Sequence, residues 1–372
     1  MLRYHEIIRP TASESFYEQS VDLWLGFASG HMGPQMYQHH TATRNGQPMS
    51  GVYTWGKHAK LGTIPTHNKE VFLSHIQDAA KHVEKGTPIV EFGPGSMDDA
   101  SLLIRSMESE QYIPVDCNLD VINQARALAQ KTNGCVISPS VIDFFSEENC
   151  RLTDRPALGV FLGITIGNIP GSVPKGEPRH ELVGAFRNLT KAIPAGGYLL
   201  VSTDVCQDGE RNKALYSEPW HKLFGVNHVC RMAEELPMHN FDPDGFEYLP
   251  VWHEHCSLLA HTVIATEDQD FRMGTDQEVL VSVKKGDVFH YNNSFKYRPD
   301  FFEDCAEDAG LEIIDVWQDE GTIRLYLFHV PPIEARNSFN APKASSLHEP
   351  SLPIFYSAGH LAMIQDKLQR AA

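Results

Sequence analysis

The sequence predicts an α/β protein in which a doubly wound, largely parallel sheet carries helices on both faces and supports a second, smaller lobe. Three observations predict this. Short apolar segments alternate with helix-compatible segments from residue 87 to residue 203, over short connections. The first apolar segment ends in a Gly-x-Gly turn at Gly93 and Gly95. The alternation then breaks at residue 204 and returns only near residue 301, which indicates an insertion.

The size and composition suit one large domain or two smaller ones. The chain has 372 residues, of which 42% are hydrophobic and 21% are charged, so it can bury a substantial core. No apolar run approaches the about 20 residues that a membrane-spanning helix needs. The first residues lack the basic and then apolar pattern of a signal peptide. We therefore expect a cytoplasmic protein that does not engage a membrane.

Charge and cysteine usage exclude further classes of function. With 31 basic and 48 acidic residues the formal net charge is −17 at pH 7, and no basic cluster is present, which argues against a nucleic-acid partner. The seven cysteines are an odd, widely spaced set without a C-x-x-C motif, as expected for reduced, structural cysteine. His253 and His255 share one face of a possible strand, but no further ligand follows at a suitable spacing, so we expect no metal site.

Local patterns place the elements of the sheet in order. Strands are predicted at residues 88–92, 112–116, 136–138, 157–166 and 198–203, because each range is a short apolar run. Helices are predicted at 98–107, 119–130 and 181–193, where apolar side chains such as Leu103 and Met107 recur at helical spacing. A last helix at 301–309 and strands at 311–317 and 322–329 suit a reversed hairpin that closes the sheet.

The remaining segments are assigned to the second lobe and to an arm. Helices are expected at 13–27, with Ser13 as cap, and at 68–83, separated by an aromatic, Gly-rich loop at 30–62. The insertion has strand-like passages at 257–265 and 278–283. We expect residues 76–205 and 293–335 to form the core, and residues 1–75 and 206–292 to form the second lobe. Residues 336–372, with a helix-compatible 358–368, would form an arm through which a homodimer is possible.

Polar or glycine residues recur where the predicted strands end. Gly93, Asp116, Asp143 and Asn168 follow four successive strands at nearly equal intervals. In an open α/β sheet such carboxyl ends lie side by side, and ligands bind there. Asp116 lies about 20 residues beyond the glycine turn, which suits the hydroxyls of a ribose. Asp143 with Phe144 suits an adenine amino group and ring face. Taken singly, either aspartate is also a plausible cap of a helix or turn.

Two cofactors fit this edge, NAD and S-adenosylmethionine. The strict dinucleotide fingerprint G-x-G-x-x-G fails, because its third position is occupied by Asp98. Glu91 followed by Gly93 and Gly95, with a later aspartate, is the looser pattern typical of class I methyltransferases with a Rossmann-like sheet. S-adenosylmethionine is therefore the favoured cofactor, with an NAD-dependent enzyme as the alternative.

More specific motifs resemble the histidine-specific methyltransferase family, the enzymes of ergothioneine synthesis that trimethylate the α-amino group of histidine. The resemblance spans roughly residues 60 to 330. Its elements are Glu91 to Gly95, Pro114 to Asp116, Asp143-Phe144, Phe161 to Asn168, Asp204-Val205, Tyr216, Phe241 to Glu247, and Ser294-x-Lys296-Tyr297. The run F-L-G-x-T-I-G-N at 161–168 is the most specific of these.

The resemblance implies roles for individual residues. Glu91, Gly93, Gly95, Asp116, Asp143 and Phe144 would hold S-adenosylmethionine. Asn168 and Tyr216 would hold the carboxylate and amine of an amino-acid substrate, and these two are the candidate catalytic residues. Ser294 would contact the substrate side chain. For Tyr216 and Ser294 the alternatives are an ordinary half-buried tyrosine and a solvent-facing strand hydroxyl, and for Asn168 a turn residue.

The chain departs from the family pattern where that pattern reads the substrate. Asn292 stands where the family has a glutamate that reads the imidazole, and His261 lies near the family's apolar side-chain contact. Residues 63–66 replace a pair of tyrosines. A site built for one polar group rejects a partner that lacks it, so we expect an amino acid or derived amine other than plain histidine. The alternatives are a histidine methyltransferase proper and an inactive subunit that binds S-adenosylmethionine.

Overall fold

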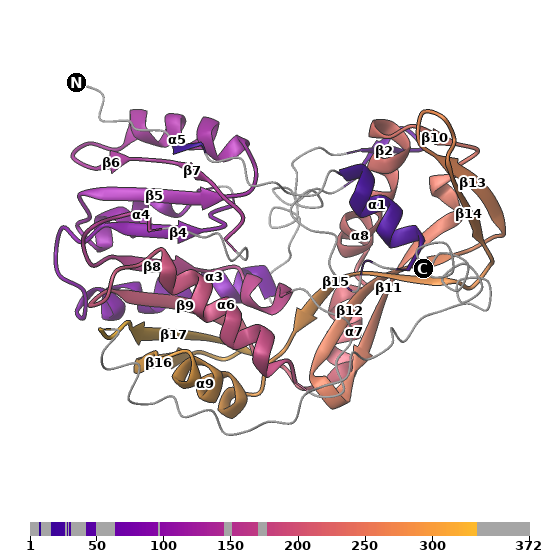
Figure 1. Cartoon of the computed structure of the whole chain (residues 1–372). Coiled ribbons are helices and arrows are strands. Elements are labelled where there is room, and N and C mark those ends of the chain that lie inside the picture. Colours follow the sequence, from indigo (N-terminus) through magenta and orange to yellow (C-terminus); the bar gives the residue numbers. More distant parts are fainter. Residues whose placement is uncertain are drawn as a thin grey trace, which may run out of the picture.

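The computed structural model describes residues 7–8, 16–26, 28, 30, 42–49, 64–95, 97–144, 151–169 and 177–332. Figure 1 shows two lobes side by side, an α/β lobe at the left and a lobe rich in antiparallel strands at the right. Most of the loop expected at 30–62 and the whole arm at 336–372, with its possible dimer contact, lie outside the described residues. No helix among the described residues is long and apolar enough to cross a membrane.

The larger lobe is built on one nine-stranded sheet whose inner strands are parallel. In spatial order the strands of the whole sheet are β1 (Ile7–Ile8), β7 (Ser140–Val141), β5 (Gln111–Asp116), β4 (Ile89–Phe92), β8 (Leu158–Phe161), β9 (Tyr198–Asp204), β17 (Ile323–His329) and β16 (Glu312–Gln318). The short strand β6 (Val136–Ile137) pairs with β5. The chain runs outward from β4 to β5 and β7, then returns to β8 on the other side of β4. This reversal confirms the doubly wound sheet and places its switch point between β4 and β8.

The expected reversed hairpin closes the sheet. β17 runs antiparallel to β9, with Leu327 opposite Leu200, and β16 runs antiparallel to β17. Helices cover both faces, as the alternation of strand side chains requires. α3 (Ile64–Ala80), α4 (Ala100–Ser106) and α5 (Asp120–Lys131) share one apolar cluster with Ile89, and α6 (Arg179–Lys191) and α9 (Pro299–Asp308) share the other with Val90.

The second lobe surrounds a core of its own. Its main sheet consists of β11 (Phe246–His253), β12 (Leu258–Ala265) and β15 (Val288–Phe295), and a smaller one of β10 (Met238–His239), β13 (Gln269–Met273) and β14 (Val279–Val283). The helices α1 (Phe16–Trp24), α7 (Gly209–Tyr216) and α8 (Pro219–Glu235) and the hairpin of β2 (Thr43–Arg44) and β3 (Gln47–Pro48) complete the lobe. Trp24, with 0% exposure, packs against the rings of Phe246, Phe271 and Phe289.

Several expectations need correction. The run at 157–166 is a strand only to Phe161, because positive φ values at Gly163 and Ile164 turn the chain into the 3₁₀ helix η3 (Thr165–Asn168). The short helix α7 and the long helix α8 of the insertion were not expected; α8 is buried on most sides and lacks a clear polar stripe.

The N-terminal 75 residues are also divided differently from the expectation. α1 packs in the second lobe, but β1 joins the core sheet beside β7, and α3 packs on that sheet. In addition, β15 crosses the expected boundary at residue 293. The chain therefore returns to the core along a strand that belongs to the second lobe.

Candidate functional site

The glycine turn after β4 leaves open space at the sheet edge. Gly93 and Gly95 have φ values of 62° and 57°, which residues with a Cβ rarely adopt. A Cβ on Gly95 would meet nothing within 4 Å, and one on Gly93 would lie 3.5 Å from the Phe144 ring. The turn is held in place because the Gly93 N–H donates to the Val115 carbonyl over 2.7 Å. The backbone at Gly95 is thus open to the close approach of a ligand, while Gly93 lies against the Phe144 ring.

The two acidic strand ends lie close to one another. Asp116 ends β5, and its Oδ1 accepts the backbone N–H of Asn118 at 3.0 Å. Burial raises the pKa of the Cys117 thiol well above its ordinary value, and the charges of Asp116 and Asp143 raise it further, so both carboxylates are near that thiol. Burial also raises the pKa of Asp116 itself. A carboxylate that has lost water in this way is suited to accept hydrogen bonds from a polar ligand.

Glu91 lies on β4, two residues before Gly93. Its Oε2 accepts the Tyr112 hydroxyl at 2.5 Å. Burial raises the pKa of Glu91 to about 7, although the Tyr112 hydrogen bond opposes the shift, and the nearby Asp99 charge adds to it. The carboxyl group therefore changes charge near neutral pH.

The 3₁₀ helix η3 carries Asn168 across to the second lobe. Gly167 lies so close to β15 that a Cβ there would be 2.6 Å from the Phe295 carbonyl oxygen. The Asn293 side-chain amide donates to the Ile169 carbonyl at 3.0 Å, and the Tyr297 hydroxyl donates to the Ile166 carbonyl at 3.2 Å. Asn168 is half-buried at this contact between the lobes. The backbone on either side of Asn168 is therefore held by hydrogen bonds from β15 and the residues that follow it.

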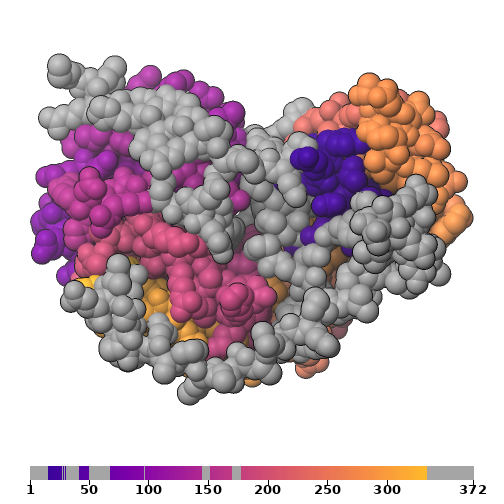
Figure 2. Space-filling model, viewed as in Figure 1, coloured from indigo at the N-terminus to yellow at the C-terminus, as the bar shows by residue number. Residues whose placement is uncertain are grey.

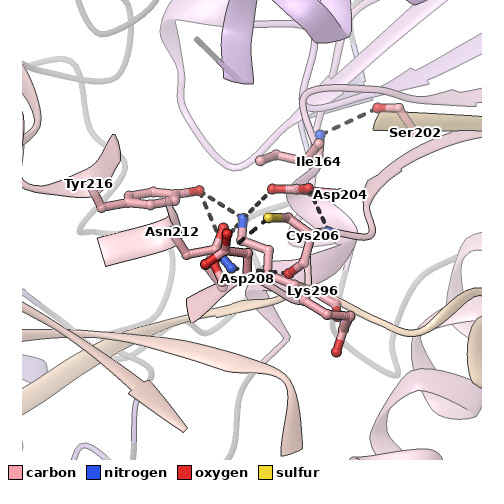
Figure 3. A network of polar contacts seen from close by, with 10 residues as sticks. Ile164, Ser202, Asp204, Cys206, Asp208, Asn212, Tyr216 and Lys296 are labelled. Carbon is pink, nitrogen blue, oxygen red and sulfur yellow. Dashed lines mark hydrogen bonds and ion pairs between the residues drawn. The ribbon is translucent and has the colours of Figure 1, made fainter. Parts of the chain in front are cut away.

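A buried polar network lies beside η3, where α7, β9 and the end of β15 meet. Figure 3 shows the Lys296 ammonium between Tyr216 and Asp204. Its Nζ donates to Tyr216 Oη at 2.8 Å and to Ser294 Oγ at 3.1 Å, and forms an ion pair with Asp204 Oδ2 at 3.1 Å. The two hydroxyl oxygens are 3.4 Å apart. All four side chains are at most 3% exposed.

Charge in this network is fixed by the ion pair. Burial lowers the pKa of Lys296, but the Asp204 carboxylate raises it by more, with Tyr216 contributing, and the net shift is upward. Lys296 is therefore an ammonium at neutral pH, although the side chain has 0% exposure.

His261 and Asn292 extend the network into the second lobe. They are directly opposite each other in the pairing of β12 with β15, next to an irregularity in the register. The His261 ring meets the Tyr216 ring edge-on at 5.2 Å, and its Nδ1 is hydrogen-bonded to the Tyr248 hydroxyl at 2.7 Å. Burial lowers the pKa of His261 well below its ordinary value, and the Lys296 charge lowers it further. His261 is therefore neutral at physiological pH.

The cofactor edge and this network face each other. The carboxyl ends of the parallel strands lie on the side of the sheet that faces the second lobe, as the contact of Asp204 with Lys296 also shows. Figure 2 shows the molecular surface hollowed between the two lobes on the upper side of the view. A ligand at the glycine turn and a second ligand at Tyr216 would therefore approach each other between the lobes.

The structure thus gathers the residues singled out from the sequence into two groups. Glu91, Gly93, Gly95, Asp116, Asp143 and Phe144 lie along the sheet edge, and Asn168, Tyr216, His261, Asn292 and Ser294 lie where η3, α7, β12 and β15 meet. Lys296, Asp204 and Tyr248 were given no role. Two features of the sequence could have indicated a role for them. Lys296 follows Ser294 by two residues, and Asp204 stands at the end of a predicted strand.

His253 and His255 do not form a metal site with other side chains of the described residues. Their ring centroids are 6.1 Å apart. No group of three or more His, Cys, Asp or Glu side chains suited to a metal ion occurs in the part of the chain that the structure describes.

Comparison with known proteins identifies the class to which this site belongs. A family profile described as "Histidine-specific methyltransferase, SAM-dependent" matches residues 65–330. An uncharacterized protein y4iF from Sinorhizobium fredii is 29% identical over 257 residues, which are 66% of this chain and 81% of that protein. N-methyltransferase fsqC from Aspergillus fumigatus is 23% identical over 68% of this chain and 69% of its own length. The 4-dimethylallyltryptophan N-methyltransferase easF from Arthroderma benhamiae is 19% identical over 73% and 83%.

The glycine cradle and the desolvated Asp116 fit S-adenosylmethionine as the cofactor of the profile, and NAD is set aside. The match covers well over half of the sequence, and the chain belongs to the family of histidine-specific, S-adenosylmethionine-dependent methyltransferases.

Proposed function

We propose that this enzyme methylates the amine of a free amino acid or a close derivative, and that the preferred acceptor is not plain histidine. The observation that carries the proposal is that a buried amide, Asn292, occupies the position where the family resemblance places a glutamate. Asn292 is 5% exposed and lies opposite His261, which is neutral. The nearby carboxylate of Asp204 is already paired with Lys296. An imidazole N–H would gain no anionic partner from these residues.

The residues of the sheet edge would hold the methyl donor. Asp116 would accept hydrogen bonds from ribose hydroxyls, Asp143 and Phe144 would hold the adenine, and Glu91 and the glycine turn would enclose the amino-acid end. S-adenosylmethionine supplies a sulfonium methyl group. Transfer forms a bond from the amine nitrogen to the methyl carbon as the carbon–sulfur bond breaks, and the amine loses one proton.

Asn168 would orient the amine. Its amide oxygen can accept an amine N–H, which leaves the nitrogen lone pair directed at the methyl group. His261 is a poor acceptor for the released proton, because its pKa is held well below the ordinary value by burial and by Lys296. We therefore infer that the amine loses its proton to solvent before the reacting geometry is reached.

The relatives support an amine acceptor derived from an amino acid. Two of them carry the name N-methyltransferase, and the name of one of these states its substrate as 4-dimethylallyltryptophan. The ring-rich surroundings of Tyr216, with His221 at 4.6 Å and His261 at 5.2 Å between ring centroids, are suited to a substrate with an extended or aromatic side chain.

A panel assay tests the proposal. Purified enzyme is incubated with methyl-labelled S-adenosylmethionine and each of the common amino acids and 4-dimethylallyltryptophan, and products are identified by mass. We expect methylation of an acceptor other than histidine. Trimethylhistidine as the sole product would overturn the inference from Asn292. Binding of S-adenosylhomocysteine by calorimetry, without product from any amine, would instead indicate an inactive subunit.

A cytoplasmic location is part of the proposal. The described cysteines are all free thiols, four of them buried. This usage is typical of a reducing compartment.

A further inference from the structure

The Lys296 ammonium is enclosed by three oxygens, two that accept hydrogen bonds and one in an ion pair. An ammonium has three N–H donors and no acceptor. Tyr216 Oη, Ser294 Oγ and Asp204 Oδ2 lie 2.8, 3.1 and 3.1 Å from Nζ. Lys296 has 0% exposure, so no donor remains for a substrate. The lysine therefore acts on any ligand through the two hydroxyl groups.

The bonds from Lys296 decide what those hydroxyl groups can do. Each hydroxyl oxygen accepts from the ammonium, which leaves its single proton to be donated elsewhere. Tyr216 and Ser294 are 3.4 Å apart, and only one of them can donate to the other. At least one hydroxyl proton is consequently available to an acceptor on a ligand. Without the ammonium, the same hydroxyls could equally accept from an amine.

Stability alone does not account for this ion pair. Replacing a buried ion pair with apolar side chains of similar volume is often neutral or stabilising, because desolvation offsets the attraction. Asp204 and Lys296 come from opposite lobes, from the end of β9 and from the residue after β15. Asp204 Oδ1 also accepts the Cys206 N–H at 3.1 Å. The pair is thus fixed to the core and sets the geometry of two side chains that we assign to the substrate.

We propose that Lys296, held by Asp204, is a positioning residue that keeps Tyr216 and Ser294 as hydrogen-bond donors, and that it thereby strengthens the hold on the substrate carboxylate that the family resemblance already assigns to Tyr216. This inference rests on the proposed function. The reacting amine must keep its lone pair for the methyl group, so a donor directed at the amine would oppose transfer. A carboxylate is the acceptor that stands next to the amine in an α-amino acid, and charge-assisted hydrogen bonds to it are strong.

The test compares acids with amides that carry the same side chain. The probes are L-histidine, L-tryptophan, L-tyrosine, L-phenylalanine and their carboxamides. The variant is the double substitution Lys296→Met with Asp204→Asn, which leaves no unpaired buried charge. We expect the wild type to favour acids and the variant to lose about tenfold to a hundredfold of its acid-over-amide ratio in kcat/KM. The loss should appear as a higher KM for acids, with KM for amides unchanged.

A second ion pair, buried at its arginine and partly exposed at its glutamate, provides the control. Arg231, 2% exposed, is bound to Glu235 at 2.6 Å on α8. Arg231→Met with Glu235→Gln should lower the melting temperature without changing the acid-over-amide ratio. Calorimetry with S-adenosylhomocysteine should give equal affinities for all three proteins.

Three outcomes separate the possible failures. An unchanged acid-over-amide ratio in the Lys296 and Asp204 variant overturns the positioning role and leaves the proposed function intact. Equal use of acids and amides by the wild type overturns carboxylate recognition while amine methylation stands. If the enzyme forms no product from the acids, the carboxamides or 4-dimethylallyltryptophan, the proposed function is wrong, and the positioning role is wrong as well.

Discussion

Burial raises the pKa of the Asp116 carboxylate. A carboxylate that has lost water in this way destabilises the fold when no ligand is bound. We expect Asp116→Ala to weaken binding of S-adenosylmethionine by about 1–3 kcal/mol, as for loss of hydrogen bonds to a charged group. The melting temperature of the free protein should stay the same or rise, because a desolvated charge is removed. Calorimetric titration and thermal unfolding measure the two effects.

Asp154→Ala is the control for this substitution, since Asp154 is exposed in the segment before β8, away from the carboxyl ends of the strands. It should change neither quantity. Unaltered affinity in Asp116→Ala would remove Asp116 from the cofactor site. A large fall in the melting temperature would assign it a structural role instead.

Asn292 tests how the substrate side chain is recognised. The family resemblance implies a glutamate at this place that reads an imidazole, so Asn292→Glu should raise kcat/KM for L-histidine about tenfold or more relative to the best acceptor of the wild type. Asn292→Gln has the same length without the charge and should leave the preference unchanged. A similar gain with glutamine would show that side-chain length, not charge, selects the substrate.

For individual residues, the sequence predicted which side chains lie along the same sheet edge, but it did not predict the contacts between distant side chains. The sheet-edge residues could be predicted because the ends of parallel strands meet at one edge in any doubly wound sheet. The ion pair of Lys296 with Asp204 could not, because it depends on how the insertion folds back onto β9. No local pattern contains that information, and a lysine in a strand-like run is usually exposed.

Among the elements, η3 lies between the two groups of candidate site residues. Its backbone lies against β15 because Gly167 has no Cβ. We expect Gly167→Ala to push η3 away from Phe295, lowering the free energy of unfolding by about 1–3 kcal/mol and displacing Asn168. Substrate kcat/KM should fall as well, while affinity for S-adenosylhomocysteine changes little.

Gly184→Ala is the matched control for that element. Gly184 lies within α6, and a Cβ there would meet nothing within 4 Å. Because glycine is unfavourable inside a helix, this substitution should stabilise the protein by about 0.5–1 kcal/mol without affecting turnover. A Gly167→Ala enzyme with normal stability and kcat/KM would show that η3 tolerates separation from β15.

The prediction of elements failed where tertiary contacts override the local pattern. The apolar run at 157–166 reads as one strand, but β8 ends at Phe161 and the rest becomes η3, whose conformation is fixed by contacts with β15. α8 was missed because several of its polar side chains, including His228 and Arg231, are buried in the second lobe. Periodicity detects helices with one apolar face.

On the scale of the whole molecule, the two lobes differ in how burial shifts the pKa values of their titratable groups. Burial lowers the pKa of His221 and His228 to about 3 and that of His290 to about 4, and it also lowers the pKa of His261 well below the ordinary value. All four belong to the second lobe. In the core, by contrast, burial raises the pKa of Glu91 to about 7.

These shifts have opposite consequences when the solution is acidified. A histidine with a lowered folded pKa stabilises the fold above its unfolded pKa near 6.5, and this contribution is lost as the pH falls towards the folded value. Glu91 has a raised folded pKa, so its stabilising contribution is present below the unfolded value of 4.5 and is lost as the pH rises through about 7. Acid should therefore weaken the second lobe and spare the glycine turn.

We expect hydrogen-exchange protection, corrected for intrinsic rates, to fall in α8, β12 and β15 between pH 7 and pH 5 while β4 and β5 keep theirs. Each buried histidine can contribute up to about 1.4 kcal/mol per pH unit below its unfolded pKa.

The variant His228→Asn should be less stable at pH 7, because the His228 ring packs on Tyr291 at 4.1 Å between ring centroids, but it should show a shallower dependence of stability on pH. Equal loss of protection in both lobes, or an unchanged slope in the variant, would contradict the assignment. Because Tyr216, His261 and Ser294, which we propose contact the substrate, belong to the weakened lobe, turnover should decline over this range before binding of S-adenosylhomocysteine does.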